Sequence, residues 1–487
     1  MNVPYQKKLL IEREIARPFI IKASNNNKNK QIPNLPSELI RDIFFHLKDD
    51  KKTLSACTLV NHTFNLHATP ILYQTVTFTF PNTFVLFANA ISGESYRTSL
   101  IKHLDLSSFS TFGLQKSHSE TETQKSVTPQ ALINILKSTP MLEAFSVSES
   151  LESAITIDVL RTLVSECRNL KSLDFCGCSS KQFNDAMKDL VKSLGLVQIV
   201  QFQTSADSDI EYGFQRLQPL LPHIKRLSLH ECLTLSEHET ILPLLAHMPN
   251  ITHLDLGGCS ISDLTLEFLE TETNTSNTLL QLSLAKCKNI TSDGISRFVS
   301  QCNRLENLNL YGDTMISEWD LVTILSSPSA ESLRSLDIGF SHITQRVLNA
   351  IKKHCSSSLQ NLGLANAEIT TPANLSTFLI SMPQLQYIDL SNIPCLNPLN
   401  TNGLMFKLQK DSNNQLHTIE MSESLLKKIQ AVKDWKIDQN YGRRWYYAKE
   451  TRIGIPQADR VHNRKLDVVG TGEHAMSKIY QYYSFGV

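Results

Sequence analysis

Residues 282–295 read LSLAKCKNITSDGI, and this stretch decides the fold. It begins with Leu282 and Leu284, two apolar residues on either side of a polar one, which is the alternation of a strand with one buried face. From its last residue onward, Ile295, Phe298 and Val299 have the spacing of apolar residues on one face of a helix. The stretch therefore predicts one unit of strand, turn and helix.

The same alternation recurs through most of the chain. Between Leu254 and Ile388 the copies follow one another at steps of 26 to 28 residues. A period in the twenties built on the pattern L-x-x-L-x-L indicates a leucine-rich repeat. The first apolar residues of the clear copies are Leu104, Leu173, Leu227, Leu254, Leu282, Leu308, Leu336, Leu362 and Ile388.

Weaker copies extend the array to about thirteen strands. We place three of them at Val76, Phe145 and Ile419. Leu173 and Leu227 are 54 residues apart, which is twice the usual step, so we expect a degenerate copy between them at residues 200–202 (VQF). The polar stretch 107–126 is interpreted as a loop inserted in one repeat.

Strands that are joined by helices must run parallel, because a parallel pair needs a long crossover connection. Helices of constant length along one side of the strands make such an array curve. We therefore predict an α/β fold, a horseshoe-shaped solenoid with parallel strands inside and helices outside. The predicted domains are a flexible N-terminal arm (1–31), a small helical head (32–72), the solenoid (73–425) and a C-terminal cap or tail (426–487).

The cysteines follow the register of the repeat. Cys178, Cys232, Cys259 and Cys287 each lie five residues after the first apolar residue of their strand. A position that recurs with the repeat indicates a packing role, since a free Cys behaves as a small buried hydrophobe. The close pair in residues 176–178 (CGC) has no second pair at zinc-ligand spacing, and the histidines supply no third ligand. We predict no metal site and no cofactor.

Residues 32–47 read IPNLPSELIRDIFFHL and open a short helical head before the first strand. Pro36 and Glu38 suit the first turn of a helix. Two further short helices follow, and the third is predicted to end at Pro70. About forty residues of this composition cannot bury their apolar surface without help. The head is therefore either a cap over the open end of the solenoid or a module that a partner covers.

The series LPSEL at residues 35–39 and IFFHL at residues 43–47, placed before repeats that carry Cys287 and Cys302, resembles the F-box proteins with leucine-rich repeats of the cysteine-containing subclass. The resemblance implies a three-helix F-box that docks on the adaptor subunit of a Skp–cullin–F-box ubiquitin ligase. It departs from the family at residues 61–64 (NHTF), which keep only the aromatic residue of the usual ending. By resemblance, the adaptor would contact Leu35, Pro36, Leu39, Ile43, Phe44, Leu47, Leu54 and Val60.

The same resemblance implies the function of a substrate-recognition subunit that is not itself an enzyme. Its partners would be the Skp-type adaptor, the cullin and RING subunits joined through that adaptor, and a protein substrate held by the solenoid. The sequence contains no G-x-S-x-G, P-loop or G-x-G-x-x-G motif, so we predict no catalytic residues. The alternative function is a leucine-rich-repeat scaffold that acts outside any ubiquitin ligase.

Residues between the two apolar positions of each strand face the inside of the predicted horseshoe, because side chains alternate along a strand. Several of them are Asp, which either form an acidic stripe for a basic substrate or are simply common at this position. Flanking positions on the same face vary more, and variation on a constant scaffold is where specificity is expected. The candidate substrate-binding residues are Asp174, Arg226, His230, His253, Asp255, Tyr311, Asp337, Tyr387 and Asp389.

The charge of the 487-residue chain is balanced, with 47 Lys and Arg against 47 Asp and Glu. This balance gives no reason to expect nucleic acid or an anionic membrane as the main partner. No apolar run approaches the roughly 20 residues that span a bilayer. Residues 1–31 also lack the uninterrupted apolar centre of a secretory signal. We therefore expect the cytoplasm or the nucleus.

The end of the chain differs in composition from the repeats. Aromatic residues such as Trp445 and Tyr446 alternate there with Arg443, Arg444 and Lys449. Such a pattern can bind a peptide or a nucleic-acid strand. It also suits a terminal cap, which solenoids require, and the cap is the interpretation that we favour.

Overall fold

The structure is a computed structural model of two compact units, Met1–Leu72 and Tyr73–Val487. The predicted arm (1–31), most of the predicted inserted loop (107–126) and the tail beyond residue 449 lie outside the described residues. None of the described helices combines the length and the apolar composition that crossing a bilayer requires. The described residues are 35–48, 50–78, 81–91, 95–109, 126–195, 199–203, 210–214, 220–313, 316–369, 371–410, 415–416, 418–429, 435–439 and 445–449.

The first unit is built from α2 (Ser37–His46), α3 (Lys51–Cys57) and the greater part of α4 (His62–Gln74). The Asp50 side chain starts α3 by accepting a hydrogen bond from the Thr53 amide at 3.0 Å. The rings of Phe44 and Phe64 meet edge to face, with centroids 5.2 Å apart. The helices enclose a small core of Ile40, Phe44, Leu54, Ala68 and Ile71.

The third helix of this unit does not end at Pro70, so that prediction is wrong. Pro70 lies inside α4, which continues to Gln74. A proline removes one backbone hydrogen bond from a helix interior. The helix passes through it because Ala68 and Ile71, on either side, are both buried in the core.

The second unit is a solenoid whose strands form a continuous parallel sheet, which confirms the predicted fold class. In each pair the central apolar residues lie opposite one another, as Leu282 and Leu308 do. The parallel strands are β1 (Thr75–Thr77), β2 (His103–Asp105), β3 (Ala144–Ser146), β4 (Ser172–Asp174), β7 (Arg226–Ser228), β8 (His253–Asp255), β9 (Gln281–Ser283), β10 (Asn307–Asn309), β11 (Ser335–Asp337), β12 (Asn361–Gly363), β13 (Tyr387–Asp389) and β14 (Thr418–Met421).

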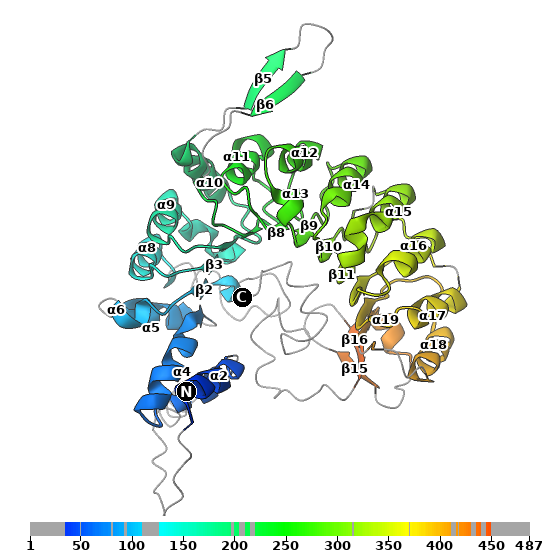
Figure 1. The fold of residues 1–487 in the computed structure, drawn as a ribbon, viewed down its shortest axis with the longest axis horizontal. Coiled ribbons are helices and arrows are strands. Elements are labelled where there is room, and N and C mark those ends of the chain that lie inside the picture. The colour runs from blue at the N-terminus through cyan, green and yellow to red at the C-terminus, as the bar shows by residue number, and fades with distance from the viewer. Residues whose placement is uncertain are drawn as a thin grey trace, which may run out of the picture. The chain divides into compact units, whose positions relative to one another are not determined.

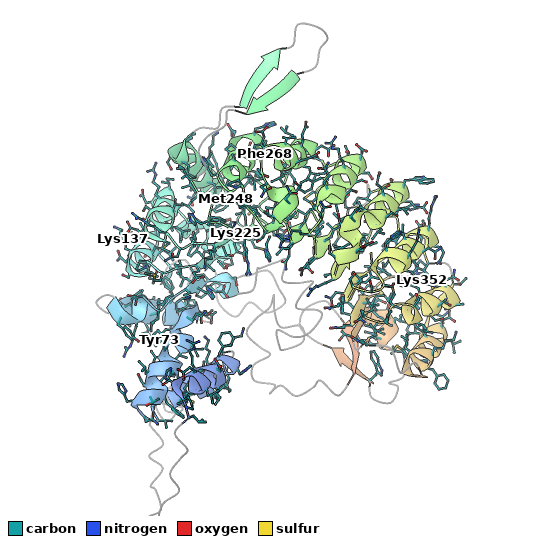
Figure 2. All side chains as sticks on the ribbon, in the orientation of Figure 1. Tyr73, Lys137, Lys225, Met248, Phe268 and Lys352 are labelled. Atoms are coloured by element: carbon teal, nitrogen blue, oxygen red, sulfur yellow. The ribbon has the colours of Figure 1, made fainter. Side chains whose placement is uncertain are left out.

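The helices of this unit lie on the outer side of a curved array, with the strands on its inner side (Figure 1). Buried side chains such as Phe268 fill the layer between helices and sheet (Figure 2). The α-helices are α5 (Pro81–Ile91), α6 (Ser95–Thr98), α8 (Pro129–Ser138), α9 (Ile157–Glu166), α10 (Lys181–Leu194), α11 (Leu242–Ala246), α12 (Asp263–Thr271), α13 (Thr275–Thr278), α14 (Ser292–Gln301), α15 (Glu318–Ser326), α16 (Gln345–Cys355), α17 (Pro372–Ile380), α18 (Pro398–Lys410) and α19 (Glu423–Leu426). Shorter helical turns are η1 (Ser107–Phe109), η2 (Glu149–Ala154), η3 (Glu237–Ile241) and η4 (Pro328–Ser332).

A carboxylate at the start of one outer helix or helical turn often supports the start of the next. Glu237 Oε1 accepts a hydrogen bond from the amide of Ser262 at 2.8 Å, and Asp263 Oδ1 accepts one from the amide of Thr291 at 2.8 Å. The same contact explains why residue 294 is a glycine, because a Cβ at that position would overlap the Asp263 carboxylate. Thr291 and Gly294 of the TSDG segment are thereby explained by contact with the preceding repeat.

The parallel array ends in two antiparallel strands. β16 (Trp445–Lys449) pairs with β14, and β15 (Trp435–Gln439) pairs with β16. The described part of the tail therefore covers an edge of β14 that would otherwise present unpaired backbone groups.

The prediction of a repeat strand at residues 200–202 is wrong. These residues belong to β5 (Ile199–Gln203), which pairs antiparallel with β6 (Ile210–Phe214) in a separate two-stranded sheet. β4 pairs directly with β7. The chain leaves the parallel array after Gly195 and rejoins it at Leu221, and both residues contact His247. The backbone of Gly195 lies beside the His247 ring, and the Leu221 amide donates to the His247 carbonyl at 3.1 Å.

We expect the solenoid to fold without the β5–β6 excursion. Replacing residues 196–219 with a short Gly-Ser linker should shift the midpoint of thermal unfolding by less than about 4 °C, because a change of about 1 kcal/mol has at most that effect in a chain of this size. Circular dichroism would measure it. Loss of the cooperative transition would show that residues 196–219 contribute to the array.

The predicted core position of the repeat cysteines is confirmed. Cys232, Cys259 and Cys287 are buried, and their thiols donate to backbone carbonyls of the preceding repeat at 3.0 to 3.2 Å. Burial raises the pKa of the Cys302 and Cys355 thiols to about 12. All ten cysteines are free.

Native-state thiol chemistry should distinguish two groups of cysteines. Cys57 and Cys395 are half-buried and the other eight are buried. We expect a disulfide reagent such as DTNB to react quickly with no more than these two, because the thiolate is the reactive form and burial disfavours it. The remaining thiols should react only in denaturant. A Cys57→Ser, Cys395→Ser variant should lose the fast phase, and fast reaction of further thiols in that variant would contradict the assignment.

Candidate interaction surfaces

Helix α2 carries two apolar faces. Ile40 and Phe44 turn into the core of the first unit, whereas Leu39 and Ile43, one turn apart on a neighbouring face, are about half exposed, at 50% and 48%. Leu35, just before the helix, is 45% exposed. Soluble proteins seldom leave such large apolar side chains together in water unless a partner covers them.

The residues predicted for adaptor contact fall into an exposed group and a buried group. Leu35, Pro36, Leu39, Ile43 and Val60 are exposed. Phe44 and Leu54, in contrast, are buried in the core, and Leu47 is half-buried against it. Neighbouring positions on a helix are about 100° apart, so of Ile43 and Phe44 one turns outward and the other inward.

Three further apolar residues of this unit are exposed and were not predicted from the sequence. They are Phe45 (55%), Leu59 (77%) and Leu66 (52%). The ring of Phe45 lies 5.5 Å from the ammonium group of Lys48. No periodic signal marks them, because Leu59 follows the end of α3 and Phe45 falls on the side of α2 expected to be polar. We define the head surface as Leu35, Leu39, Ile43, Phe45, Leu59, Val60 and Leu66.

The Asp side chains on the inner side of the solenoid form hydrogen bonds with the turn that follows their own strand. Asp255 Oδ1 accepts a hydrogen bond from the amide of Gly257 at 2.9 Å, two residues ahead. Asp174, Asp337 and Asp389 make the same contact at 2.8 to 3.0 Å. A side chain that bonds the backbone two residues on closes an Asx turn. The geometry therefore accounts for the recurring Asp as the residue that closes the turn after the strands that carry it.

A residue with positive φ lies three positions after the last residue of strands β7, β9 and β11. Glu231, Lys286 and Phe340 adopt φ values of 57°, 59° and 67°. Their amides donate to carbonyls of the next repeat, as Lys286 does to Tyr311 at 2.9 Å and Phe340 to Ala365 at 2.8 Å. The strained conformation is kept because it makes this bond between repeats.

We expect Asp255→Ala to lower the free energy of unfolding by about 1 to 3 kcal/mol, the cost of leaving a buried donor unpaired. Asp255→Asn keeps an oxygen acceptor and should lose clearly less. Chemical denaturation would measure both. Equal losses would show that the charge of Asp255, rather than its turn contact, supports the fold.

Other predicted substrate-binding residues lie on the same inner side. Arg226 and His253 are register partners on β7 and β8 and are half-buried. Burial, together with the charge of Arg226, lowers the pKa of His253 to about 4. His230 Nδ1 lies 3.1 Å from Asp255 Oδ1. His253 is therefore neutral at physiological pH.

The remaining two predicted residues differ in exposure. Tyr387 is buried and its hydroxyl donates to Glu420 Oε2 at 2.6 Å. Tyr311 is half-buried and meets Phe340 edge to face at 5.2 Å. Across the described residues, no group of three or more His, Cys, Asp or Glu side chains is arranged to hold a metal ion.

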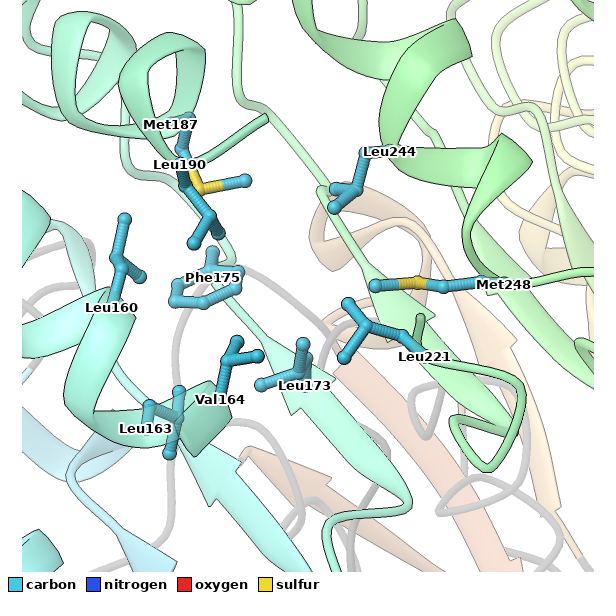
Figure 3. Close-up of a pocket in the computed structure, with 10 residues that line it drawn as sticks. All are labelled: Leu160, Leu163, Val164, Leu173, Phe175, Met187, Leu190, Leu221, Leu244 and Met248. Carbon is cyan, nitrogen blue, oxygen red and sulfur yellow. The ribbon is translucent and has the colours of Figure 1, made fainter. Parts of the chain in front are cut away.

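A small apolar pocket marks the place where the regular repeat is interrupted (Figure 3). It opens beside Leu221, at the point where the chain returns from the β5–β6 excursion. Its wall consists of Leu160, Leu163, Val164, Leu173, Phe175, Met187, Leu190, Leu221, Leu244 and Met248. The pocket contains no polar group that would orient a ligand, so we interpret it as a packing gap left by the missing repeat.

His247 adjoins this region and is buried at 1% exposure. Within the described residues, its ring nitrogens make no hydrogen bond of normal geometry. The backbone of Gly195 lies close to the ring and raises the pKa of His247, against the larger effect of burial. Burial lowers the pKa of His247 below its ordinary value. The folded protein therefore disfavours the protonated form of this histidine.

His247 should make the protein sensitive to mild acid. Below pH 6.5 the unfolded chain binds a proton at this histidine more readily than the folded chain does. Stability is therefore full above that pH and falls as the pH drops toward the lowered pKa. We expect His247→Phe to gain stability relative to the native protein between pH 7 and pH 5, measured by urea unfolding at several pH values. A constant difference across this range would contradict it.

Comparison with known proteins finds a family match in each of the two parts of the chain. Residues 32–111 match the COS11 F-box domain family, and residues 247–269 match a leucine-rich repeat family. The first match extends beyond the helical head, past residue 72, into the start of the solenoid. The predicted resemblance is confirmed for these two modules.

Two curated relatives are F-box proteins of yeasts. The chain is 25% identical to F-box protein YLR352W of Saccharomyces cerevisiae over 275 residues, which cover 56% of this chain and 32% of the relative. It is 35% identical to F-box protein COS111 of Candida glabrata over 80 residues, 16% of this chain and 9% of the relative. The matched regions thus span about a third or less of the length of these relatives.

Among solved structures, the chain is similar to one from the complex of Rad7 and Elc1 in yeast. The sequence identity is 15% and the TM-score is 0.45. The similarity covers 80% of this chain and 91% of the solved one.

Proposed function

From an F-box domain of the COS111 type at residues 32–111, followed by leucine-rich repeats, we propose that this chain is the substrate-recognition subunit of a Skp–cullin–F-box ubiquitin ligase. The observation that carries the proposal is the head surface. It presents apolar side chains on a unit too small to bury them itself. A Skp-type adaptor that covered this surface would link the chain to cullin and RING subunits.

Leu39 and Ile43 are the centre of the proposed adaptor contact. They lie on one face of α2, next to the core residues Ile40 and Phe44 that hold the helix in place. Exposed aliphatic anchors on a fixed helix are the kind of side chain that dominates the binding free energy of such interfaces. Phe44 and Leu54 support the surface from beneath instead of contacting the adaptor directly.

The solenoid is proposed to hold a protein substrate on its inner side and to perform no bond chemistry itself. Arg226, His253 and Tyr311 are the preferred contact residues, because the Asp side chains beside them already close the turns of the repeat. A rigid receptor would raise the effective concentration of a substrate lysine at the conjugating enzyme. The proposal needs no cofactor, and it places the protein in the cytoplasm or the nucleus.

The alternative function, a scaffold outside any ligase, keeps the solenoid and dispenses with adaptor binding. The two functions therefore differ in a single observable, the capture of a Skp-type adaptor by the head surface.

Replacing both Leu39 and Ile43 with Ala should reduce recovery of a purified Skp-type adaptor in a pull-down by at least about tenfold, since each anchor contributes ~2 kcal/mol or more. Both side chains are half exposed, so the free energy of unfolding should change by less than about 1 kcal/mol. Circular dichroism on the same samples would verify that the variant is folded.

A matched control is Leu233→Ala with Leu399→Ala, two exposed leucines of the solenoid that lie outside residues 32–111. This variant should recover the adaptor like the native protein. Phe44→Ala should lose the adaptor together with the fold of the head, because a buried Phe is removed. Native-level recovery by the Leu39, Ile43 variant would favour the scaffold function.

A further inference from the structure

Trp319 and Arg346 form a feature on the outer side of the solenoid that the proposed function leaves unused. Trp319 lies in the first turn of α15 and is 63% exposed. Arg346 lies in the first turn of α16, and its guanidinium carbon is 3.8 Å from the centroid of the indole ring. The two residues are 27 positions apart, so they occupy the same place in consecutive repeats.

The helix starts on both sides hold this stack in place. Ser317 caps α15 by accepting a hydrogen bond from the Asp320 amide at 3.1 Å. Glu318 Oε1 accepts one from the hydroxyl of Thr344, the capping residue of α16, at 2.7 Å. The indole is therefore presented on a fixed backbone, and a rigid aromatic group loses little conformational entropy when it is bound.

The charge of the first turn of α16 differs from that of α12, α14 and α15. α12, α14 and α15 carry acidic residues in the first turn, whereas α16 has none and places Arg346 there. A cation at the positive end of a helix is unfavourable. Within the described part of the chain no carboxylate forms an ion pair with Arg346. The contact that the structure shows for the Arg346 guanidinium is the stack on Trp319.

Further cations lie along α16. Lys352 (Figure 2) and Lys353 are exposed on α16, and the helix contains no Asp or Glu. Arg346, Asn349 and Lys353 follow the spacing i, i+3, i+7 of one helix face. The nearest acidic side chains on α15 are occupied, since Glu318 is bound by Thr344 and Asp320 by Ser317 at 2.6 Å.

We propose that the Trp319–Arg346 surface binds an acidic segment of a partner protein. A guanidinium stacked on an aromatic ring keeps its donor fork oriented, and that fork matches a carboxylate. Trp319 supplies apolar contact area, and Lys353, two turns along α16, meets a second carboxylate. Trp and Arg are the residues that most often dominate the binding energy of protein interfaces.

A nucleic-acid partner fits this surface less well. Phosphate backbones are bound through many cations at once, each releasing counterions. α16 offers three, beside an exposed tryptophan and a neutral α17. The mixture of one aromatic anchor and a few cations favours a protein segment in which acidic and apolar residues alternate.

The test uses the full chain and two fluorescein-labelled peptides of about twelve residues, one of alternating Glu and Leu and one in which Lys replaces Glu. Fluorescence anisotropy at low salt would give each Kd. The native chain should bind the acidic peptide at least tenfold more tightly than the basic one. Arg346→Glu and Trp319→Ala should each weaken binding of the acidic peptide at least tenfold.

The control is Arg161→Glu, the same change of charge at an exposed position on α9, and it should leave the Kd within twofold. All variants should unfold near the native temperature, and adaptor recovery should stay unchanged, because the surface shares no residue with the head. Equal binding of the two peptides by the native chain, or native-like binding by Arg346→Glu, would overturn the proposal. So would the same loss with Arg161→Glu.

Discussion

The structure depends on the backbone register that joins each repeat to the next. The central leucine of one strand lies opposite the central leucine of its neighbour, as with Leu308 and Leu336. At the turn, a residue with positive φ donates its amide to a carbonyl of the following repeat. Between Leu254 and Ile388 the strands joined in this way follow one another at steps of 26 to 28 residues. The cysteines, the Asx turns and the helix caps recur because they occupy fixed places within this step.

The register also decides which side chains are available for function. Asp255 and its equivalents bond the turn that follows their own strand, so the repeating charge on the inner side belongs to the architecture. Positions whose side chains do not close this turn, such as those of Arg226 and Tyr311, carry different residues from one repeat to the next. The head obeys another constraint. It is a unit with a five-residue core, and its size forces apolar side chains outward where a partner can cover them.

Much of the fold could be predicted from the sequence because period and alternation are long-range signals. Residues 200–202 were misassigned because an apolar-polar-apolar triplet is the same in a hairpin strand as in a repeat strand. In the head, Ile43 and Phe44 are adjacent and both apolar, so only packing shows which faces the core. The structural role of Asp255 depends on a hydrogen bond to the Gly257 amide, and the sequence pattern does not predict that bond. The Trp319–Arg346 stack could have been found, since their spacing equals one repeat.

The central claim is that the head, and not the solenoid, carries the adaptor contact. Hydrogen–deuterium exchange of the full chain, with and without a purified Skp-type adaptor, tests it most directly. The predicted result is slower exchange confined to residues 35–66, with the amides of the parallel strands unchanged. Protection that falls on the strands or outer helices of the solenoid, or no protection at saturating adaptor, would contradict the account.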